Sequence, residues 1–159
     1  MAEASAPALA IRVDRSLEHA DHRRMHIDGR CHCGAISYEA EVEPETTGIC
    51  HCTDCQALTG TAFRVTVKAP AEHFVLRGKP TIYLKTAESG RKRAHAFCPT
   101  CGSPIYAAAP ENPTAYGLRI GLIRQRNELK PRKAIWCASA LPWSTDLEAL
   151  DLERHDQQP

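Results

Sequence analysis

Aromatic residues, long apolar runs and an excess of charge of either sign are all scarce in this chain. Phe, Trp and Tyr make up 6% of its 159 residues. No run approaches the roughly 18 apolar residues that a membrane-spanning helix needs. Twenty basic residues against nineteen acidic ones leave a net charge of +1, which is too small for nonspecific binding to nucleic-acid phosphates. We therefore expect neither a membrane span nor a nucleic-acid partner.

The start of the chain, MAEASAPALAIRVDRS, lacks the basic segment and the long apolar stretch of a secretory signal. We therefore expect a cytoplasmic protein. Its length, with 43% hydrophobic and 25% charged residues, fits one globular domain. Residues 1–24 are Ala-rich and then mixed in charge, which predicts a flexible N-terminal tail. We expect the domain over residues 25–145 and a C-terminal tail over 146–159.

Cysteine is the residue type that stands out, with eight in the chain. Seven of them fall into three tight groups: Cys31 and Cys33; Cys50, Cys52 and Cys55; Cys98 and Cys101. In a reducing compartment, C-x-C and C-x-x-C spacings are typical of metal ligands rather than of a disulfide framework. The disulfide alternative would lead only for an exported protein.

The seven clustered cysteines divide into four plus three. The first and last groups together supply four thiolates, enough to close a tetrahedral zinc site. Gly34 and Gly102 follow the two pairs and allow the tight turns that such a knuckle needs. A closed site has no free position for a reactant, so we assign this one to structure.

The middle group, Cys50, Cys52 and Cys55, offers three sulfurs within six residues. A zinc ion bound by three thiolates keeps one position for a further ligand, and three anionic sulfurs favour thiol chemistry over water activation. The alternative is a second closed structural site, completed by Cys137, His51 or His32. We expect Cys137 to be a buried small apolar residue, because it lies in the run Ala-Ile-Trp-Cys-Ala.

The other polar residues give weaker signals. We expect His32 and His51, within the C-x-C motifs, to be exposed to solvent. The basic segment from Ser89 to Arg93 can receive the carboxylates of an anionic substrate, although a charged turn between strands is the simpler interpretation.

Short alternating or β-branched segments, separated by Gly and Pro, predict a mostly antiparallel β fold. Local helix is expected only over Asp54–Leu58 and at the start of the C-terminal tail, over Asp146–Glu153. No alternation of strands with helices is visible, so a thioredoxin-like redox role for either C-x-x-C motif is disfavoured. The strands are expected in these segments: MHIDGR, GAISYEAEV, AFRVTVKA, HFVLRG, TIYLKT, RAHAF, PIYAAA, YGLRIG and KAIWCAS.

Three motifs together resemble the glutathione-dependent formaldehyde-activating enzyme family, whose domain centromere protein V resembles as well. They are Gly29-Arg30-Cys31-His32-Cys33-Gly34, Cys50-His51-Cys52-Thr53-Asp54-Cys55, and Phe97-Cys98-Pro99-Thr100-Cys101-Gly102-Ser103. The resemblance extends from about Arg24 to Trp143.

The resemblance implies a β-tent (Mss4-like) fold with two zinc ions. It places a structural zinc on Cys31, Cys33, Cys98 and Cys101, and a catalytic zinc on Cys50, Cys52 and Cys55. It also implies a carbon–sulfur lyase that joins glutathione to formaldehyde, giving S-hydroxymethylglutathione, with glutathione as the small-molecule thiol partner.

Two other functions fit the same cysteines. The first is a zinc-binding scaffold for protein partners without enzymatic activity, as in relatives of this fold that bind small GTPases. The second is methionine sulfoxide reduction, which needs a separate redox cysteine in a polar pocket; Cys137, between Trp136 and Ala138, is a weak candidate for that role.

Overall fold

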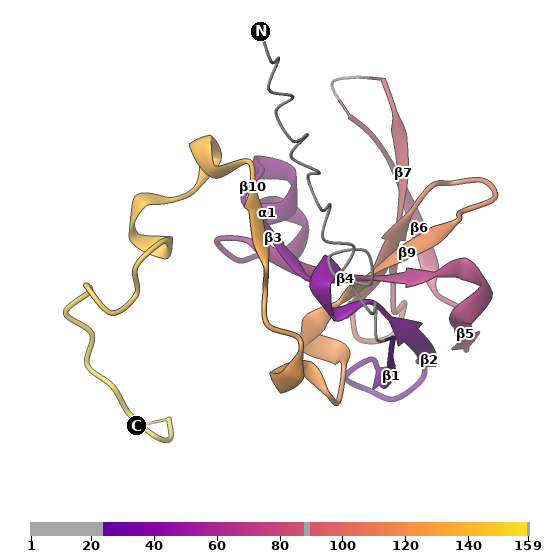
Figure 1. Cartoon of the computed structure of the whole chain (residues 1–159), viewed down its shortest axis with the longest axis horizontal. Helices are drawn as coiled ribbons and strands as arrows, with labels where there is room; N and C mark the ends of the chain where they lie inside the picture. Colours follow the sequence, from indigo (N-terminus) through magenta and orange to yellow (C-terminus); the bar gives the residue numbers. More distant parts are fainter. Residues whose placement is uncertain (1–23, 88–89, 159) are drawn as a thin grey trace, which may run out of the picture.

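The computed structural model describes residues 24–87 and 90–158, and strands in two sheets make up most of its regular structure (Figure 1). The chain is thus mainly β, as predicted. Apart from Arg24, the expected N-terminal tail lies outside the described residues, as does Ser89 of the basic segment.

Two sheets form the body of the molecule. The smaller has the order β1-β2-β5 and consists of β1 (Met25–Arg30), β2 (Ser37–Val42) and β5 (Phe74–Arg77). The larger has the order β10-β3-β4-β9-β8-β7-β6. Its strands are β10 (Lys133–Ile135), β3 (Gly48–Cys50), β4 (Arg64–Pro70), β9 (Ala115–Arg119), β8 (Pro104–Ala108), β7 (Lys92–Phe97) and β6 (Thr81–Thr86). All neighbouring strands run antiparallel except β10 and β3, which are parallel.

Helical structure is confined to short pieces. The described residues contain one α-helix, α1 (Thr53–Thr59), where the sequence predicted a helical turn over Asp54–Leu58. Gly60 ends it in the left-handed conformation, with φ +63°. The 3-10 turns are η2 (Pro44–Thr46), η3 (Ala71–His73), η4 (Ile120–Leu122), η5 (Arg126–Glu128), η6 (Cys137–Ser139) and η7 (Pro142–Ser144).

The hydrophobic core lies between the two sheets. Successive residues of a strand point to opposite faces, and the pairing of β4 with β9 sets Val67 opposite Leu118. Both are fully buried in one cluster with Ile27 of β1 and Tyr38 of β2. The apolar face of the large sheet therefore packs against the small sheet.

The same alternation sends a different set of side chains to the other face of the large sheet. Cys50 lies opposite Arg64, and Arg119 lies opposite Thr66, two residues further along β4. His95 of β7 pairs with Ala107 of β8. Charged and polar residues thus gather on the face directed away from the core.

Two of the predicted strand assignments differ from the structure. Strand β3 was not expected, because three residues containing Gly and Cys show no alternating pattern. In KAIWCAS only Lys133–Ile135 is extended, because Trp136 adopts the left-handed conformation with φ 60° and turns the chain into η6.

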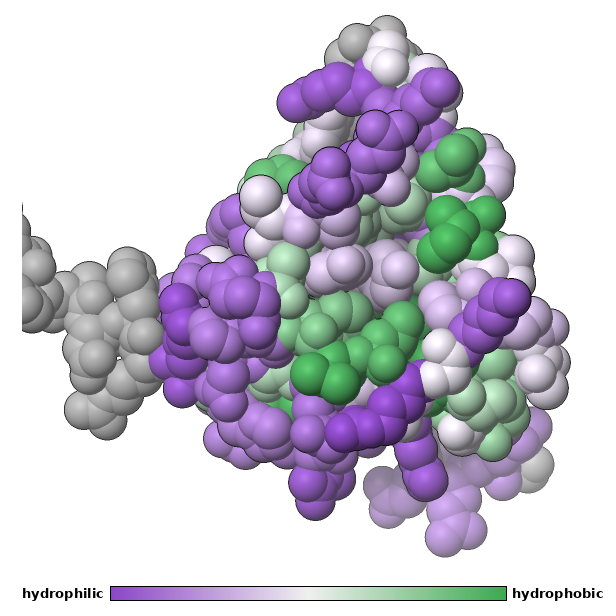
Figure 2. All heavy atoms as spheres, turned by 90° about the vertical axis from the view of Figure 1, so that its right-hand side faces the viewer, coloured by the Kyte–Doolittle hydropathy of each residue, from purple (hydrophilic) through white to green (hydrophobic). Residues whose placement is uncertain are grey.

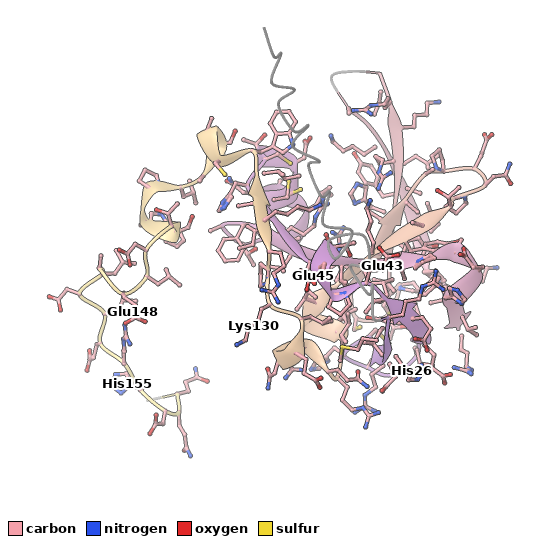
Figure 3. The ribbon with its side chains drawn as sticks, viewed as in Figure 1. His26, Glu43, Glu45, Lys130, Glu148 and His155 are labelled. Carbon is pink, nitrogen blue, oxygen red and sulfur yellow. The ribbon has the colours of Figure 1, made fainter. Side chains whose placement is uncertain are left out.

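The helix expected over Asp146–Glu153 is absent. Ala149 N–H donates to Asp146 Oδ1 at 3.2 Å, which closes a single turn, but no regular helix follows. Residues 146–158 extend away from the body as a largely exposed arm, which carries the labelled Glu148 and His155 (Figure 3). Seven of the eight residues from Asp146 to Glu153 are exposed, and a segment this short without a surface to pack against does not hold a helix. The domain boundary at residue 145 stays a prediction.

Apolar side chains also reach the surface on the side of the small sheet and of β6. Figure 2 shows that face, where green patches lie between purple charged residues. The exposed large apolar residues of β5 and β6 are Val75, Ile82, Tyr83 and Leu84. Among the described residues, no helix is long and apolar enough to cross a membrane.

We predict that Gly29→Ala destabilises the fold. Gly29 lies directly opposite Tyr38 in the β1–β2 pairing, and an added Cβ would come 2.3 Å from Cζ of that buried ring. Overpacking of this kind costs about 1 to 3 kcal/mol, which urea denaturation measures. Gly121→Ala is the matched control, because a Cβ there meets nothing within 4 Å. Equal stability of the two variants would contradict the prediction.

Candidate metal centres

The structure brings Cys31, Cys33, Cys98 and Cys101 together, although the two pairs lie far apart in sequence. Their four Sγ atoms all lie within 4.8 Å of one another. Cys33 Sγ is 3.6 Å from Cys31 Sγ and 3.7 Å from Cys98 Sγ. Sulfurs about 2.3 Å from one tetrahedral ion would be about 3.8 Å apart. The group therefore has the dimensions of a closed four-thiolate metal site.

The two cysteine pairs sit in matching backbone turns. Cys31 N–H donates to Ile36 O at 2.9 Å, and Cys98 N–H donates to Ser103 O at the same distance. Gly34 and Gly102 close the turns with φ of +81° and +73°, where a side chain would be strained. The glycines predicted to shape the two knuckles are therefore the residues that do so.

Hydrogen-bond donors lie next to two sulfurs of the four-cysteine group, where they stabilise the thiolate form that binds a cation. The backbone N–H of Ile36 donates to Cys31 Sγ at 3.2 Å. The Ser103 hydroxyl, 3.3 Å from Cys101 Sγ, lowers the pKa of Cys101 to about 5, with help from backbone N–H groups. A thiolate that already exists at neutral pH binds a metal without first losing a proton.

The second group joins the end of β3 to the start of α1. Its sulfurs form a triangle with sides of 3.5 Å (Cys50 to Cys52), 3.1 Å (Cys52 to Cys55) and 3.3 Å (Cys55 to Cys50). We call these three residues the triad. All eight cysteines are free thiols, so the disulfide alternative does not hold in this structure. Burial raises the pKa of the Cys55 thiol, and a bound cation would offset that effect.

No fourth ligand completes the triad among the described residues. His, Cys, Asp and Glu were all candidates, but only the three cysteine sulfurs lie within 4.8 Å of one another. Cys137 is exposed in η6 rather than buried, since the turn at Trp136 directs the chain to solvent. His32 is exposed, as expected. The geometry thus leaves one position of a tetrahedral ion to a ligand from outside the described chain.

His51 differs from the prediction, because it is buried rather than exposed. Its ring packs edge-on against Phe63 with centroids 5.6 Å apart. Its backbone N–H donates to Ile135 O at 3.0 Å, which fastens β3 to β10. This burial could not be predicted from the sequence, because neither β3 nor its pairing with β10 was expected.

Helix α1 is fixed at several points over the polar face of the large sheet. Gln56 Nε2 donates to His51 O at 2.7 Å and to Ser139 O at 2.9 Å. Asp54, at the start of the helix, forms an ion pair with Lys85 of β6. The triad therefore lies where α1, β3 and the turn after β10 meet.

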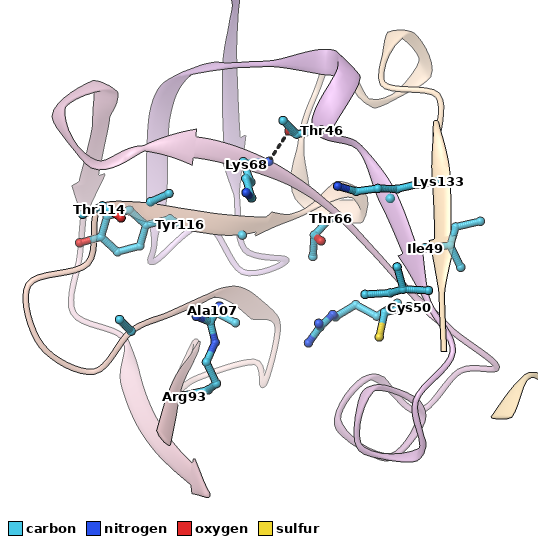
Figure 4. Close-up of a pocket in the computed structure, with 16 residues that line it drawn as sticks. Thr46, Ile49, Cys50, Thr66, Lys68, Arg93, Ala107, Thr114, Tyr116 and Lys133 are labelled. Carbon is cyan, nitrogen blue, oxygen red and sulfur yellow. Dashed lines mark hydrogen bonds between the residues drawn. The ribbon is translucent and has the colours of Figure 1, made fainter. Parts of the chain in front are cut away.

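A cavity of about 440 Å³ opens beside the triad, on the polar face of the large sheet. Cys50 forms part of its wall, and Lys68, Lys133 and Arg93 extend into the same space from β4, β10 and β7 (Figure 4). Arg64 also lines it, and the lining among the described residues includes no Asp or Glu. Its size is within the range of ligand pockets, and its charge favours an anion.

Small residues make room for this cavity. Gly48, Ala107 and Gly117 lie in its lining, in strands β3, β8 and β9. A Cβ added at Gly117 would meet only Ala107 O, at 3.4 Å. The absence of larger side chains at these positions leaves the middle of the sheet face open.

Two buried basic residues lie next to this region. Arg119 Nη2 is 3.2 Å from His95 Nδ1. Since a guanidinium can only donate, this contact requires an unprotonated Nδ1. Burial and the nearby arginines lower the pKa of His95 to about 4, and burial lowers the pKa of Arg119 to about 10. At neutral pH the pair is therefore a neutral imidazole beside a charged guanidinium.

Comparison with known proteins now gives the family. The family model of the glutathione-dependent formaldehyde-activating enzymes matches residues 26–139. The chain belongs to this family. It is also similar to the crystal structure of a Rhodobacter sphaeroides protein, a structural-genomics target, with a TM-score of 0.52 and 23% identity. That similarity covers 67% of this chain and 98% of the other, and it supports the fold alone.

The cationic cavity beside the triad is the part of the site that was not predicted from the sequence. Of its cationic residues, only Arg93 belonged to a segment that the sequence singled out. Arg64, Lys68 and Lys133 lie on strands far apart in sequence, and a period-2 pattern alone does not show which strands become neighbours.

We predict different outcomes for substitutions in the two cysteine groups. Cys98→Ser should give insoluble or unfolded protein, because structural zinc contributes about 10 to 16 kcal/mol in small domains. Cys52→Ser should lower the zinc content from two ions to one per chain and leave the fold intact. Zinc analysis and circular dichroism measure both effects. A folded Cys98→Ser variant with unchanged zinc content would refute the structural assignment.

We predict that His95 makes the fold sensitive to acid. Its pKa of about 4 in the folded protein is below the usual 6.5, so the unfolded chain binds the proton more strongly. Stability is then lost as the pH falls from 6.5 to 4, by about 2 to 3 kcal/mol.

The control for this effect is His95→Gln, which keeps an acceptor for Arg119 but does not titrate. The difference in unfolding free energy between wild type and variant should change over this pH range. A constant difference would show that His95 does not cause the acid sensitivity.

Proposed function

We propose that the protein is a zinc-dependent carbon–sulfur lyase or synthase, of the S-(hydroxymethyl)glutathione synthase type, acting on a glutathione adduct of formaldehyde or another small aldehyde. The observation that carries the proposal is a three-sulfur group that has no fourth ligand among the described residues and lies beside a cationic cavity. Membership of the formaldehyde-activating family supports the same reaction.

The donor sets suit zinc at both sites. Four thiolates form a typical closed zinc site, and three leave a position open. We propose a structural zinc on Cys31, Cys33, Cys98 and Cys101 and a catalytic zinc on Cys50, Cys52 and Cys55. A zinc ion in the open site would supply a position at which a thiol ionises more readily.

The cavity supports glutathione as the thiol. Glutathione carries carboxylates near both ends, and Arg64, Lys68, Arg93 and Lys133 surround the space next to Cys50. Arginine and lysine bind carboxylates through charge-assisted hydrogen bonds. We propose that these residues hold the peptide while its sulfur reaches the triad.

The reaction needs little more from the protein than position. The glutathione sulfur forms a bond to the aldehyde carbon, and the carbonyl oxygen takes up the proton that the thiol gives up. Thiols add to formaldehyde readily in water, so we propose that holding the thiolate next to the aldehyde is the main contribution. The reverse reaction breaks the same carbon–sulfur bond.

Further features belong to the same proposal. The scaffold is the β-tent (Mss4-like) fold, with its domain over residues 25–145 between two tails. The compartment is the cytoplasm, where the eight free thiols stay reduced.

The proposal predicts that glutathione binds and that the protein speeds exchange between free formaldehyde and its glutathione adduct. Isothermal titration measures the binding, and exchange spectroscopy measures the rate. Cys52→Ser should remove the rate effect, because it takes away one ligand of the open site. If the wild-type protein neither binds glutathione nor changes the exchange rate, the proposed function is wrong.

A matched pair of variants tests the cavity. Gly117→Leu should fill it and weaken glutathione binding at least tenfold, with two zinc ions retained. Gly117→Ala should bind nearly as wild type, since its Cβ makes only the 3.4 Å contact with Ala107 O. Equal binding by both variants would place glutathione elsewhere.

A further inference from the structure

Arg119 is buried without the partners that its charge requires. Its side chain is 5% exposed, and its Nε and Nη1 atoms have no hydrogen-bond partner among the described residues. The third nitrogen, Nη2, has the neutral His95 as its one hydrogen-bond partner among the described residues. No carboxylate of the described chain forms an ion pair with it. A buried, uncompensated charge is among the most destabilising features that a fold can contain.

The negative groups near Arg119 are the sulfurs of the triad. In the strand register, Arg119 lies on the same face as Cys50, two strands away. Cys55 and Cys50 act electrostatically on Arg119 and raise its pKa, whereas the neighbouring Arg64 and Arg93 lower it. Thiolates of the triad are therefore the available counter-charge.

Arg64 also has a buried guanidinium nitrogen without a hydrogen-bond partner in the described part of the chain, and it lies on a strand closer to the triad. It lies directly opposite Cys50 in the β3–β4 pairing, and its buried Nε also has no hydrogen-bond partner among the described residues. Its charge acts on both Cys52 and Cys55. Two guanidinium groups thus lie on the same side of the triad, one on β4 next to β3 and one on β9 beyond it.

We infer that Arg64 and Arg119 are positioning residues that balance the charge of the loaded triad. This rests on the proposed function, in which the fourth ligand is a thiolate. A divalent ion with three thiolates has a charge of −1, and a guest thiolate makes it −2. The two guanidinium groups supply +2. The site is thereby matched to an anionic guest rather than to a neutral one.

The alternative, in which Arg119 binds a carboxylate of the substrate, fits the structure less well. The two unpartnered nitrogens, Nε and Nη1, each expose less than 1 Å², so a substrate carboxylate could reach neither of them unless the surrounding side chains moved. A longer-range electrostatic role needs no such contact.

The first test measures zinc affinity by competition with a chelator, in wild type, Arg119→Met and Arg119→Lys. The four-cysteine site of the same molecule is the internal reference. Arg119→Met should weaken zinc binding at the triad by about 10- to 100-fold, the range found for residues that interact with metal ligands without binding the metal themselves. The zinc affinity of the four-cysteine site should stay the same. Arg119→Lys, which keeps the charge, should restore most of the affinity. Unchanged triad affinity in Arg119→Met, or an equal loss at both sites, would overturn the inference.

The second test compares the effect of Arg119→Met on the melting temperature in two proteins. One is zinc-loaded wild type, and the other is a Cys50→Ser, Cys52→Ser, Cys55→Ser variant with zinc in the four-cysteine site. In wild type the melting temperature should fall, because Arg119 balances the charge of the loaded triad. In the triple variant it should rise, because the buried Arg119 charge has no thiolate partner there. A fall in both would mean that Arg119 only supports the fold.

The third test examines the guest. Cobalt-substituted protein is titrated with 2-mercaptoethanol, which has no carboxylate, so any effect of Arg64 on its binding comes from the charge beside the triad. Arg64→Met should weaken thiolate binding, seen in the sulfur-to-cobalt absorption band, at least tenfold relative to Lys130→Met, the control, which removes an exposed charge outside the cavity. Equal binding by the two variants would contradict the role of Arg64. These readouts need no glutathione, so they can succeed even where the proposed glutathione reaction fails.

Discussion

The alternation of side chains across the seven-stranded sheet is the constraint on which the rest of the structure depends. Its pairing sets Val67 against Leu118 on the core side. On the opposite face, Thr66 pairs with Arg119, one residue further along the β4–β9 ladder, and Cys50 pairs with Arg64 in the neighbouring β3–β4 ladder. A shift of register by one residue would move the core to the surface and the site into the core. Fold and site are therefore specified by the same hydrogen-bonded ladders.

This constraint explains why the cysteine groups were predictable and the cavity was not. Each cysteine pair or triad spans at most six residues, so chain connectivity alone brings its sulfurs close. That the pair at Cys31 shares one site with the pair at Cys98 could be predicted because a closed zinc site needs four ligands and each pair supplies two. Lys68 and Lys133, by contrast, share a cavity because β3 lies between β4 and β10. That order is a property of the whole sheet, and no local pattern in the sequence contains it.

Errors at the ends of elements have a similar origin. The segment after Ile135 continues an apolar pattern, which suggested a longer strand and a buried Cys137. The backbone instead turns at Trp136, and a side chain of that size in the left-handed conformation is not foreseen from propensity. Burial of His51 depends on the β3–β10 contact in the same way. Both corrections concern residues next to the β3–β10 pairing, where tertiary contacts override local preference.

The near-neutral net charge conceals a strong separation of charge. Acidic residues of β2 and η2 lie in pairs with bases outside the cavity, as with Glu39 and Arg77 at 2.9 Å or Glu45 and Arg132 at 3.5 Å. The cavity on the polar face of the large sheet is lined by cations, including Arg64 and Lys133, for which the described residues provide no such acidic partner. Net charge governs long-range attraction to polyanions, whereas a small anion responds to the groups within a Debye length, about 8 to 10 Å. A composition that argues against nucleic acid is thus fully compatible with a receptor for a small anionic thiol, because the two depend on charge at different distances.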